Sequence, residues 1–133
     1  MKTTPDIIII DDDPIITRIL ESYLSSFDLI VETYNDPLLA LKMIIQDKPR
    51  IVFLDLNMPA LRGDQVIVKL SEKYIFQTTS IFLLTGTHLS EIEHMKLMTL
   101  GFDHIFRKPI SEEEITNAVK SILGTITLKQ ISA

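Results

Sequence analysis

The chain has 133 residues, a length that fits one domain with a single buried core. Of these residues 46% are apolar and 23% are charged, a balance that indicates a compact fold and argues against disorder. The formal net charge is −5 and the basic residues form no cluster, so direct contact with nucleic acid is not expected. The absence of cysteine excludes disulfides, thiolate zinc sites and cysteine nucleophiles, and it is compatible with a reducing compartment.

The amino terminus contains no recognisable targeting or membrane segment. Four isoleucines at residues 7–10 run directly into three aspartates. A signal peptide needs a longer apolar stretch, and a membrane span needs about 20 apolar residues. We therefore expect a soluble, cytoplasmic protein that makes no membrane contact.

The first half of the chain alternates short apolar runs with longer amphipathic stretches. Asp13 and Asp36 each precede a proline, a pair that predicts a helix start. The aspartate can cap the first amides, while Pro14 and Pro37 fit the first turn, where no amide hydrogen is needed. Apolar runs predict strands at residues 7–10, 29–34 and 51–54. Apolar residues at helical spacing predict helices over about residues 14–24, 37–46 and 63–74.

The second half continues the alternation. Strands are predicted at residues 80–84 and, more weakly, at 104–107. A helix that stops near Gly101 is predicted from three apolar positions, Leu89, Ile92 and Met95. Ser111 begins the last helix with Glu114 in the capping-box position, and Gly124 ends it. The methionines at helical positions are interpreted as core side chains, namely Met43, Met95 and Met98.

Five predicted strands alternate with five predicted helices, which indicates an α/β fold. The runs at 7–10 and 51–54 contain no polar residue, as expected for strands of a parallel sheet that is covered on both faces. There is no internal repeat, low-complexity tract or interdomain linker. We expect one domain over residues 1–124 and a short C-terminal tail over residues 125–133.

Polar residues collect where the apolar strands end. Residues 11–13, all aspartates, follow the first predicted strand, and Asp55 follows the third. Thr85 follows the fourth strand and Lys108 the fifth. In a parallel sheet, ligands bind beyond the carboxyl ends of the strands. The four groups together therefore predict one site, although each alone has an ordinary structural explanation as a cap, a turn or a surface residue.

Such a cluster has a definite chemistry. Ionised carboxylates within about 4–6 Å repel one another, and a divalent cation removes the conflict. Oxygen ligands without histidine or cysteine favour Mg²⁺, which can also bind a phosphate oxygen. An aspartate beside that ion is a plausible nucleophile toward phosphorus, and Lys108 and Thr85 could stabilise the transferred phosphoryl group.

Four short segments resemble the signatures of receiver domains of response regulators, the CheY-like family of two-component signalling. They are Ile-Ile-Asp11-Asp12-Asp13-Pro, Phe-Leu-Asp55-Leu-Asn57-Met-Pro59, Leu-Leu-Thr85-Gly86 and Arg-Lys108-Pro109. The resemblance covers about residues 6–124. It implies a flavodoxin-like (βα)5 three-layer sandwich whose parallel five-stranded sheet has the strand order 2-1-3-4-5.

The resemblance also implies a metal site for Mg²⁺ or Mn²⁺. Asp12 would bind the ion directly and Asp11 through water, with Asp55 and the backbone carbonyl of Asn57 completing the protein ligands. Asp13, next to a proline, is better placed as the helix cap.

For the phosphoryl group, the resemblance implies Asp55 as the acceptor, with Thr85 and Lys108 contacting the phosphoryl oxygens. The Lys108–Pro109 peptide bond would be cis. One departure concerns the switch position three residues before the lysine, where receivers usually carry an aromatic residue and this chain has Ile105. A second is Gly86 in place of the commoner alanine, in a stretch from Thr85 to Gly101 about one residue longer than usual.

The function implied is phosphoryl transfer from a phosphohistidine donor onto Asp55, followed by a change in partner-binding surface. The donor would be a histidine kinase or a histidine phosphotransfer protein, and the output a downstream protein effector. A dimer through the face of the fourth helix, fifth strand and fifth helix is compatible with this reading. The chain would be a phosphoacceptor with self-catalysed chemistry, not an enzyme.

Three other functions compete with this one. A phosphorylation-independent interaction module is favoured by Ile105 and opposed by the complete acidic site. A haloacid-dehalogenase-type phosphatase needs a second aspartate two residues after the nucleophile, where this chain has Asn57, and is rejected. A DNA-binding regulator would need a further domain, because no helix-turn-helix or basic region follows residue 124.

Overall fold

The computed structural model describes residues 4–73, 75–124 and 128–129. Strands and helices alternate along the chain as β1 (Ile7–Ile10), α1 (Pro14–Leu24), β2 (Val31–Tyr34), α2 (Pro37–Asp47), β3 (Ile51–Asp55), α3 (Gly63–Ser71), the short 3₁₀ helix η1 (Ile75–Gln77), β4 (Ser80–Thr85), α4 (Glu91–Leu100), β5 (His104–Arg107) and α5 (Glu112–Leu123). The α/β class expected from the sequence is confirmed.

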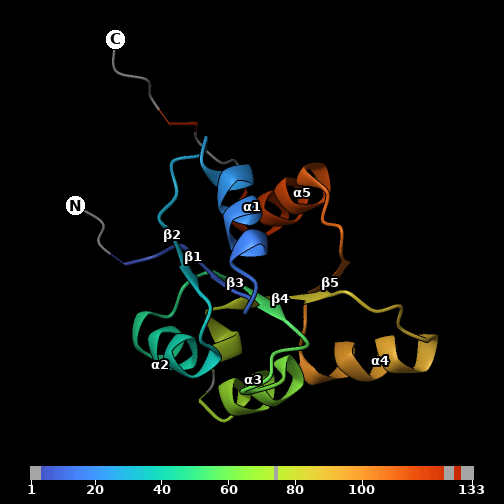
Figure 1. The fold of residues 1–133 in the computed structure, drawn as a ribbon. Helices are drawn as coiled ribbons and strands as arrows, with labels where there is room; N and C mark the ends of the chain where they lie inside the picture. The colour runs from blue at the N-terminus through green and yellow to red at the C-terminus, as the bar shows by residue number, and fades with distance from the viewer. Residues whose placement is uncertain (1–3, 74, 125–127, 130–133) are drawn as a thin grey trace.

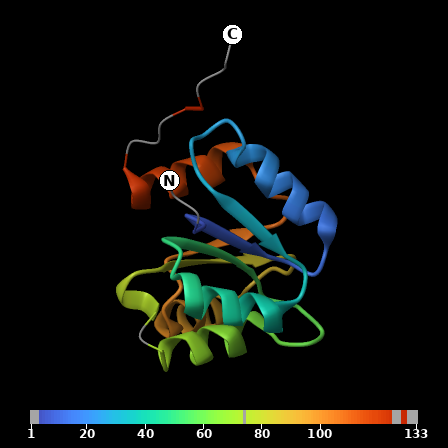
Figure 2. The same cartoon turned by 90° about the vertical axis from the view of Figure 1, so that its left-hand side faces the viewer.

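The five strands form one parallel sheet in the order β2-β1-β3-β4-β5. Helices α1 and α5 lie on one face of the sheet, and α2, α3 and α4 lie on the other (Figures 1 and 2). This is the three-layer flavodoxin-like sandwich, with the strand order that the resemblance implied.

Each face of the sheet has its own hydrophobic core. In β1, Ile8 and Ile10 pack toward α2 and α3, whereas Ile7 and Ile9 pack toward α1 and α5. The α1/α5 side also holds an aromatic group, in which the ring centroids of Phe53 and Phe82 lie 5.2 Å apart. Because all four β1 residues are fully buried, the strand needs no polar position, and this explains its continuous isoleucine run.

The predicted helix caps are present. Asp13 accepts a hydrogen bond from the amide of Ile15, and Asp36 accepts one from Leu38. The Ser111 side chain accepts a hydrogen bond from the amide of Glu114, as expected for the start of α5. The reciprocal capping box that the sequence analysis did not foresee lies at the start of α4, between Ser90 and Glu93.

Two boundaries differ from the sequence prediction by two residues or more. Strand β2 begins at Val31 instead of residue 29, because Ile30 exchanges hydrogen bonds with Asp6 before the ladder starts. Helix α3 ends at Ser71, and the predicted continuation to residue 74 reaches a position outside the described residues.

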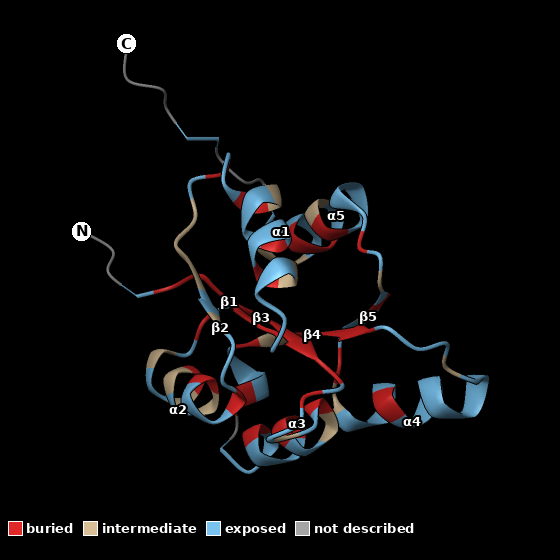
Figure 3. Cartoon of the chain, viewed as in Figure 1, coloured by how far each residue is buried: buried red, intermediate tan, exposed pale blue. Residues whose placement is uncertain are grey.

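The predicted helix that stops near Gly101 is present as α4, but two of the apolar residues that predicted it are exposed. Leu97 is the buried side chain of this helix, while Ile92 and Met95 are 66% and 69% exposed. Most of α4 is coloured as exposed in Figure 3. The interpretation of Met95 and Met98 as core side chains is therefore wrong, whereas Met43 packs against the core. Helical spacing alone could not reveal that α4 packs on the molecule through so narrow a stripe.

Two residues of the predicted C-terminal tail are described. Leu128 forms an antiparallel bridge with Phe27, and the amide of Lys129 donates to the carbonyl of Ser26 at 2.8 Å. This part of the tail lies against the loop between α1 and β2. Among the described residues, no helix combines the length and apolar character that crossing a bilayer requires.

Candidate functional site at the carboxyl edge of the sheet

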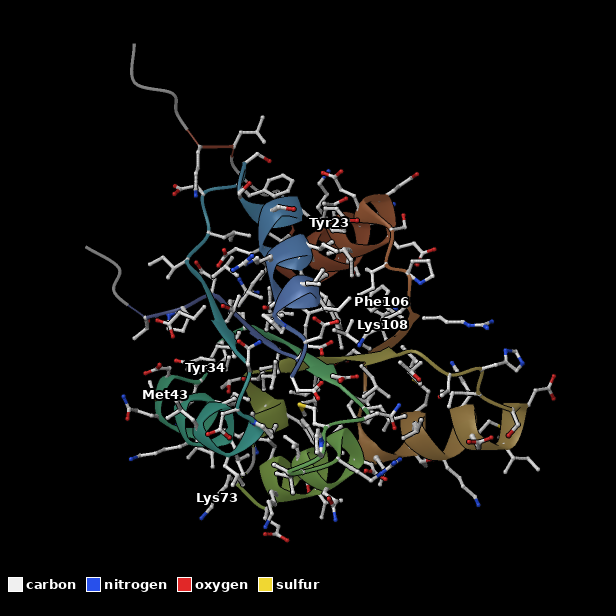
Figure 4. The ribbon with its side chains drawn as sticks, in the orientation of Figure 1. Tyr23, Tyr34, Met43, Lys73, Phe106 and Lys108 are labelled. Carbon is white, nitrogen blue, oxygen red and sulfur yellow. The ribbon has the colours of Figure 1, made fainter. Side chains whose placement is uncertain are left out.

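The predicted polar residues meet at the carboxyl edge of the sheet. Asp11 follows β1, Asp55 ends β3 and Thr85 ends β4; these three are 0%, 3% and 2% exposed. Lys108 follows β5 and is partly buried (Figure 4). Asp12 lies at the rim and is exposed. Five polar groups from four neighbouring strands thus face one small region, because parallel strands end at the same edge.

Three carboxylates form a group suited to a metal ion. Ligand atoms of Asp11, Asp12 and Asp55 all lie within 4.8 Å of one another. The buried Oδ2 of Asp11 is paired with the ammonium of Lys108, which lies 2.8 Å away. One ammonium does not neutralise three carboxylates, and a divalent cation would relieve the remaining repulsion between them. The oxygen-only donor set fits a hard divalent ion.

Lys108 connects two of the carboxylates. Its Nζ lies 2.8 Å from Asp11 Oδ2 and 3.4 Å from Asp55 Oδ1. Its backbone amide donates to the carbonyl of Thr85 at 2.8 Å, and its peptide bond to Pro109 is cis, as expected. The lysine is therefore held by its backbone and directed at the acidic pair by its side chain.

The charges at this edge change one another's titration. Burial raises the pKa of Asp55 to about 6, and the neighbouring Asp11 carboxylate adds to the rise, against the opposing effect of Lys108. For Lys108, burial lowers the pKa, but Asp11 and Asp55 more than offset this and raise the pKa above its usual value. An unneutralised negative charge on Asp55 is thus unfavourable in the metal-free site.

Thr85 is buried at the site, but its hydroxyl faces its own loop. Oγ1 lies 3.1 Å from the hydroxyl of Thr87 and accepts a hydrogen bond from the Thr87 amide at 3.2 Å. No hydrogen bond joins this hydroxyl to Asp55 among the described residues. The structure therefore brings Thr85 to the site, with its hydroxyl hydrogen-bonded within its own loop.

Asp13 and Asn57 take different places around the carboxylates. The amide of Asp13 donates to Asp11 Oδ1 at 3.0 Å, and the Asp13 side chain caps α1, as predicted. The amide of Asn57 donates to Asp55 Oδ1 at 3.4 Å, and its side chain is exposed. The role of the Asn57 carbonyl as a metal ligand stays a prediction.

The predicted switch position lies next to the site. Ile105 is half-buried in β5 and packs against the core on the α2–α4 side, while its neighbour Phe106 is buried in the opposite core. Beyond it, the Arg107 guanidinium lies 3.3 Å from Nδ1 of His88 in the loop between β4 and α4. His88 is thus a loop residue.

The sequence analysis missed two residues that shape the site. A Cβ on Gly63 would lie 2.7 Å from the carbonyl oxygen of Asp55 and 2.9 Å from Cα of Leu56, so only glycine fits at the start of α3. The side-chain amide of Asn35 donates to the carbonyl of Asp11 at 2.7 Å. The position of Gly63 at a predicted helix start was a signal in the sequence for the close packing there. Nothing in the sequence indicated the contact made by Asn35.

Comparison with known proteins agrees with this geometry. The family model of the response regulator receiver domain matches residues 7–120. The chain is 30% identical over 121 residues to Protein PilG of Pseudomonas aeruginosa, covering 91% of this chain and 89% of PilG. It is 32% identical over 118 residues to the alkaline phosphatase synthesis transcriptional regulatory protein PhoP of Bacillus subtilis, covering 88% of this chain but 48% of PhoP.

Solved structures show the same fold. The signal receiver domain of a putative Luxo repressor protein from Vibrio parahaemolyticus superimposes with a TM-score of 0.82 at 21% identity, covering 91% of each chain. The chemotaxis protein CheY4 of Vibrio cholerae gives a TM-score of 0.79 at 20% identity, covering 90% of this chain and 99% of that one. The matched segment spans most of the chain and contains every residue of the acidic site. The chain belongs to the response regulator receiver domains of two-component signalling.

Proposed function

We propose that Asp55 accepts a phosphoryl group from a phosphohistidine on a histidine kinase or a histidine phosphotransfer protein. The observation that supports this most directly is the buried Asp55 carboxylate, which lies beside two other carboxylates and 3.4 Å from the Lys108 ammonium. An aspartate in such a place can form an aspartyl-phosphate, and the ammonium offsets charge on the phosphoryl oxygens.

In the transfer step, a carboxylate oxygen of Asp55 forms a bond to phosphorus while the bond from phosphorus to the donor imidazole breaks. The electron pair of that bond stays on the imidazole nitrogen. Lys108 contacts the phosphoryl oxygens, and the Thr85 hydroxyl leaves Thr87 to reach another of them. Later, water attacks the phosphorus, inorganic phosphate leaves and the carboxylate returns. The chain is thus a phosphoacceptor with self-catalysed chemistry, not an enzyme acting on a separate substrate.

We place a Mg²⁺ or Mn²⁺ ion at this site, held by Asp12 directly, by Asp11 through water, by Asp55 and by the backbone carbonyl of Asn57. Support comes from the three converging carboxylates, whose ligand atoms all lie within 4.8 Å of one another. When bound, the ion neutralises charge and aligns the phosphoryl oxygens. The protein's own part is to hold the acceptor oxygen, exclude bulk water and supply the Lys108 charge.

We further propose that phosphorylation changes the surface formed by α4, β5 and α5, and that a downstream protein effector, or a second copy of the chain, binds there. The exposed apolar side chains of Ile92 and Met95 support a protein partner. The net charge of −5 disfavours direct nucleic-acid contact, and the lack of cysteine suits a cytoplasmic protein away from the membrane. We propose that residues 1–124 form the receiver unit.

A phosphorylation-independent interaction module is the second candidate. Two observations favour it: Ile105 replaces the usual aromatic residue, and the Thr85 hydroxyl is engaged by Thr87 in place of Asp55. This candidate does not explain why Asp55 is buried with an unfavourable negative charge, so we rank it below phosphoryl transfer.

Incubation with acetyl phosphate, with and without Mg²⁺, followed by intact-mass measurement tests the proposal. We expect a Mg²⁺-dependent gain of one phosphoryl group that is absent in Asp55→Ala and much slower in Lys108→Ala. A quenched time course with no gain in either condition would select the interaction module instead.

A further inference from the structure

Arg62, the residue before α3, is an unusual choice for its position. It occupies the N-cap of this helix, where serine, threonine, aspartate or asparagine would accept a hydrogen bond from a free amide. A guanidinium has no acceptor, and its positive charge is unfavourable at the amino end of a helix dipole. The side chain of Arg62 therefore does not cap the helix, and its backbone amide donates to the Gln65 side chain instead.

The contacts of its side chain lead toward the phosphorylation site. Nη1 of Arg62 lies 3.4 Å from Oδ1 of Asn57, and Nε lies 3.2 Å from Oδ1 of Asp64. The backbone amide of Asn57 in turn donates to Asp55 Oδ1 at 3.4 Å. Asp64 is in the first turn of α3 and is itself bonded to the amide of Gln65. The guanidinium thus ties an otherwise exposed loop residue to the start of a helix.

The loop between β3 and α3 offers few other anchors near Asn57. Gly63 fixes the far end of the loop. It packs closely on Asp55 and Leu56, and its amide donates a hydrogen bond to the Leu56 carbonyl at 2.9 Å. Asn57 is exposed, and its neighbour Met58 is buried in the core. Among the described residues, the hydrogen bond from Arg62 is the contact that holds the Asn57 side chain.

We propose that Arg62 is a positioning residue for phosphoryl transfer, which acts through the Asn57 side chain to keep the Asn57 amide against the acceptor oxygen of Asp55. It rests on the proposed function of Asp55. The bidentate reach of a guanidinium matters here, because one side chain must contact Asn57 and Asp64 together, which a lysine ammonium does less well. Accurate placement of the acceptor oxygen sets the rate of an in-line displacement.

A double-mutant cycle tests the route of action. The variants are Arg62→Ala, Asn57→Ala, which retains the backbone amide and carbonyl, and the pair together. Lys73→Ala is the matched control, since it removes one exposed positive charge beyond α3, well away from Lys108 in Figure 4. The readout is the rate of phosphorylation by acetyl phosphate in saturating Mg²⁺, followed by intact mass.

We expect each single variant to slow phosphorylation by about 3–10-fold, with the double variant no slower than the worse single, since residues that act in series are not additive. Arg62→Lys should recover part of the rate, and Lys73→Ala should match the parent. Multiplied single effects would show that Arg62 does not act through Asn57, and a parental rate in Arg62→Ala would remove its role; either result overturns the inference.

Failure of the proposed function is distinguishable. If the parent itself gains no phosphoryl group, the function of Asp55 fails, and the positioning is then judged by NMR on the unphosphorylated protein. The backbone and side-chain amide resonances of Asn57 should shift in Arg62→Ala and stay unchanged in Lys73→Ala. Unshifted Asn57 resonances in Arg62→Ala would overturn the inference on their own.

Discussion

Helices α4 and α5 begin in the same way and end up held very differently. Each has a serine N-cap, Ser90 or Ser111, whose side chain accepts from the amide of a glutamate three residues later. Helix α5 buries Ile115, Ala118 and Val119 against the sheet and α1, whereas α4 buries Leu97 alone among its residues (Figure 3). Capping therefore sets where a helix starts, while the number of side chains it buries sets how firmly it is held.

The segment that joins β4 to α4 is held by polar contacts and by Leu89, which packs against the core. Thr85 and Thr87 bond to each other, and Arg107 contacts His88. A single hydrogen bond of this kind contributes only about 0.5–1.5 kcal/mol net, less than a well-buried apolar side chain does. The weakly anchored helix thus follows a strand end at the acidic site, which suits the proposed movement of this helix on phosphorylation of Asp55.

The strongest way to break this comparison is to remove buried methyl groups from α5. Ile115→Ala should lower the free energy of unfolding by about 2–4 kcal/mol, because Ile115 is fully buried. Met95→Ala in α4 should change it by less than about 0.5 kcal/mol, because Met95 is 69% exposed. Urea denaturation measures both. Equal losses in the two variants would mean that α4 is anchored as firmly as α5.

The charge of Asp55 offers a second test, because a buried negative charge destabilises the site to which α4 is proposed to respond. The pKa of Asp55 is raised to about 6, so the folded protein binds this proton more tightly than the unfolded chain does. Stability is therefore lost as the pH rises from about 4 to about 6, and the full penalty applies above that range.

Asp55→Asn removes this titration. Without Mg²⁺ at pH 7, we expect the variant to be more stable than the parent by about 1–3 kcal/mol, a difference that shrinks toward zero near pH 4. Denaturation in a chelator across this pH range is the measurement, with Mg²⁺ addition to the parent as the control. A variant less stable than the parent at pH 7 would contradict the view that the ionised Asp55 carboxylate destabilises the metal-free protein.

The smallest expected effect sharpens the comparison within the loop. Thr87→Ala removes a hydroxyl that contacts Thr85, so the amides of α4 should exchange with deuterium about 2–5-fold faster, while those of α5 keep their rate. Peptide-level exchange by mass spectrometry resolves the two helices. Equal acceleration in both would indicate global destabilisation and would argue against a locally held α4.

The strands and the acidic edge could be predicted from the sequence because the signals are local. An isoleucine run such as residues 7–10 is stable only as a strand buried on both faces of a sheet. An aspartate such as Asp55, at the end of a buried strand, lies at the carboxyl edge of that sheet. Burial of α4 could not be predicted, because Ile92 and Met95 have the spacing of core residues and are nonetheless exposed. Their environment depends on how α4 is set against its neighbours.

Within the site, the composition was predictable and the contacts were not. Asp11, Asp55 and Lys108 converge because the sheet brings their strand ends together. The hydroxyl of Thr85 is turned by its own loop, and Arg62 reaches Asn57 across another loop. Such arrangements depend on loop paths that no periodic pattern encodes.

The pairing of Leu128 and Lys129 with the loop before β2 has a practical consequence for handling the protein. That loop, which includes Ser26 and Phe27, lies at the amino edge of the sheet, opposite the edge that carries Asp55. A fluorophore, affinity handle or surface linker attached beyond Lys129 therefore starts on the side of the molecule away from the acidic pocket. Immobilised through that end, the domain presents the edge that carries Asp55 to the solution, which suits binding measurements with the proposed phosphodonor proteins.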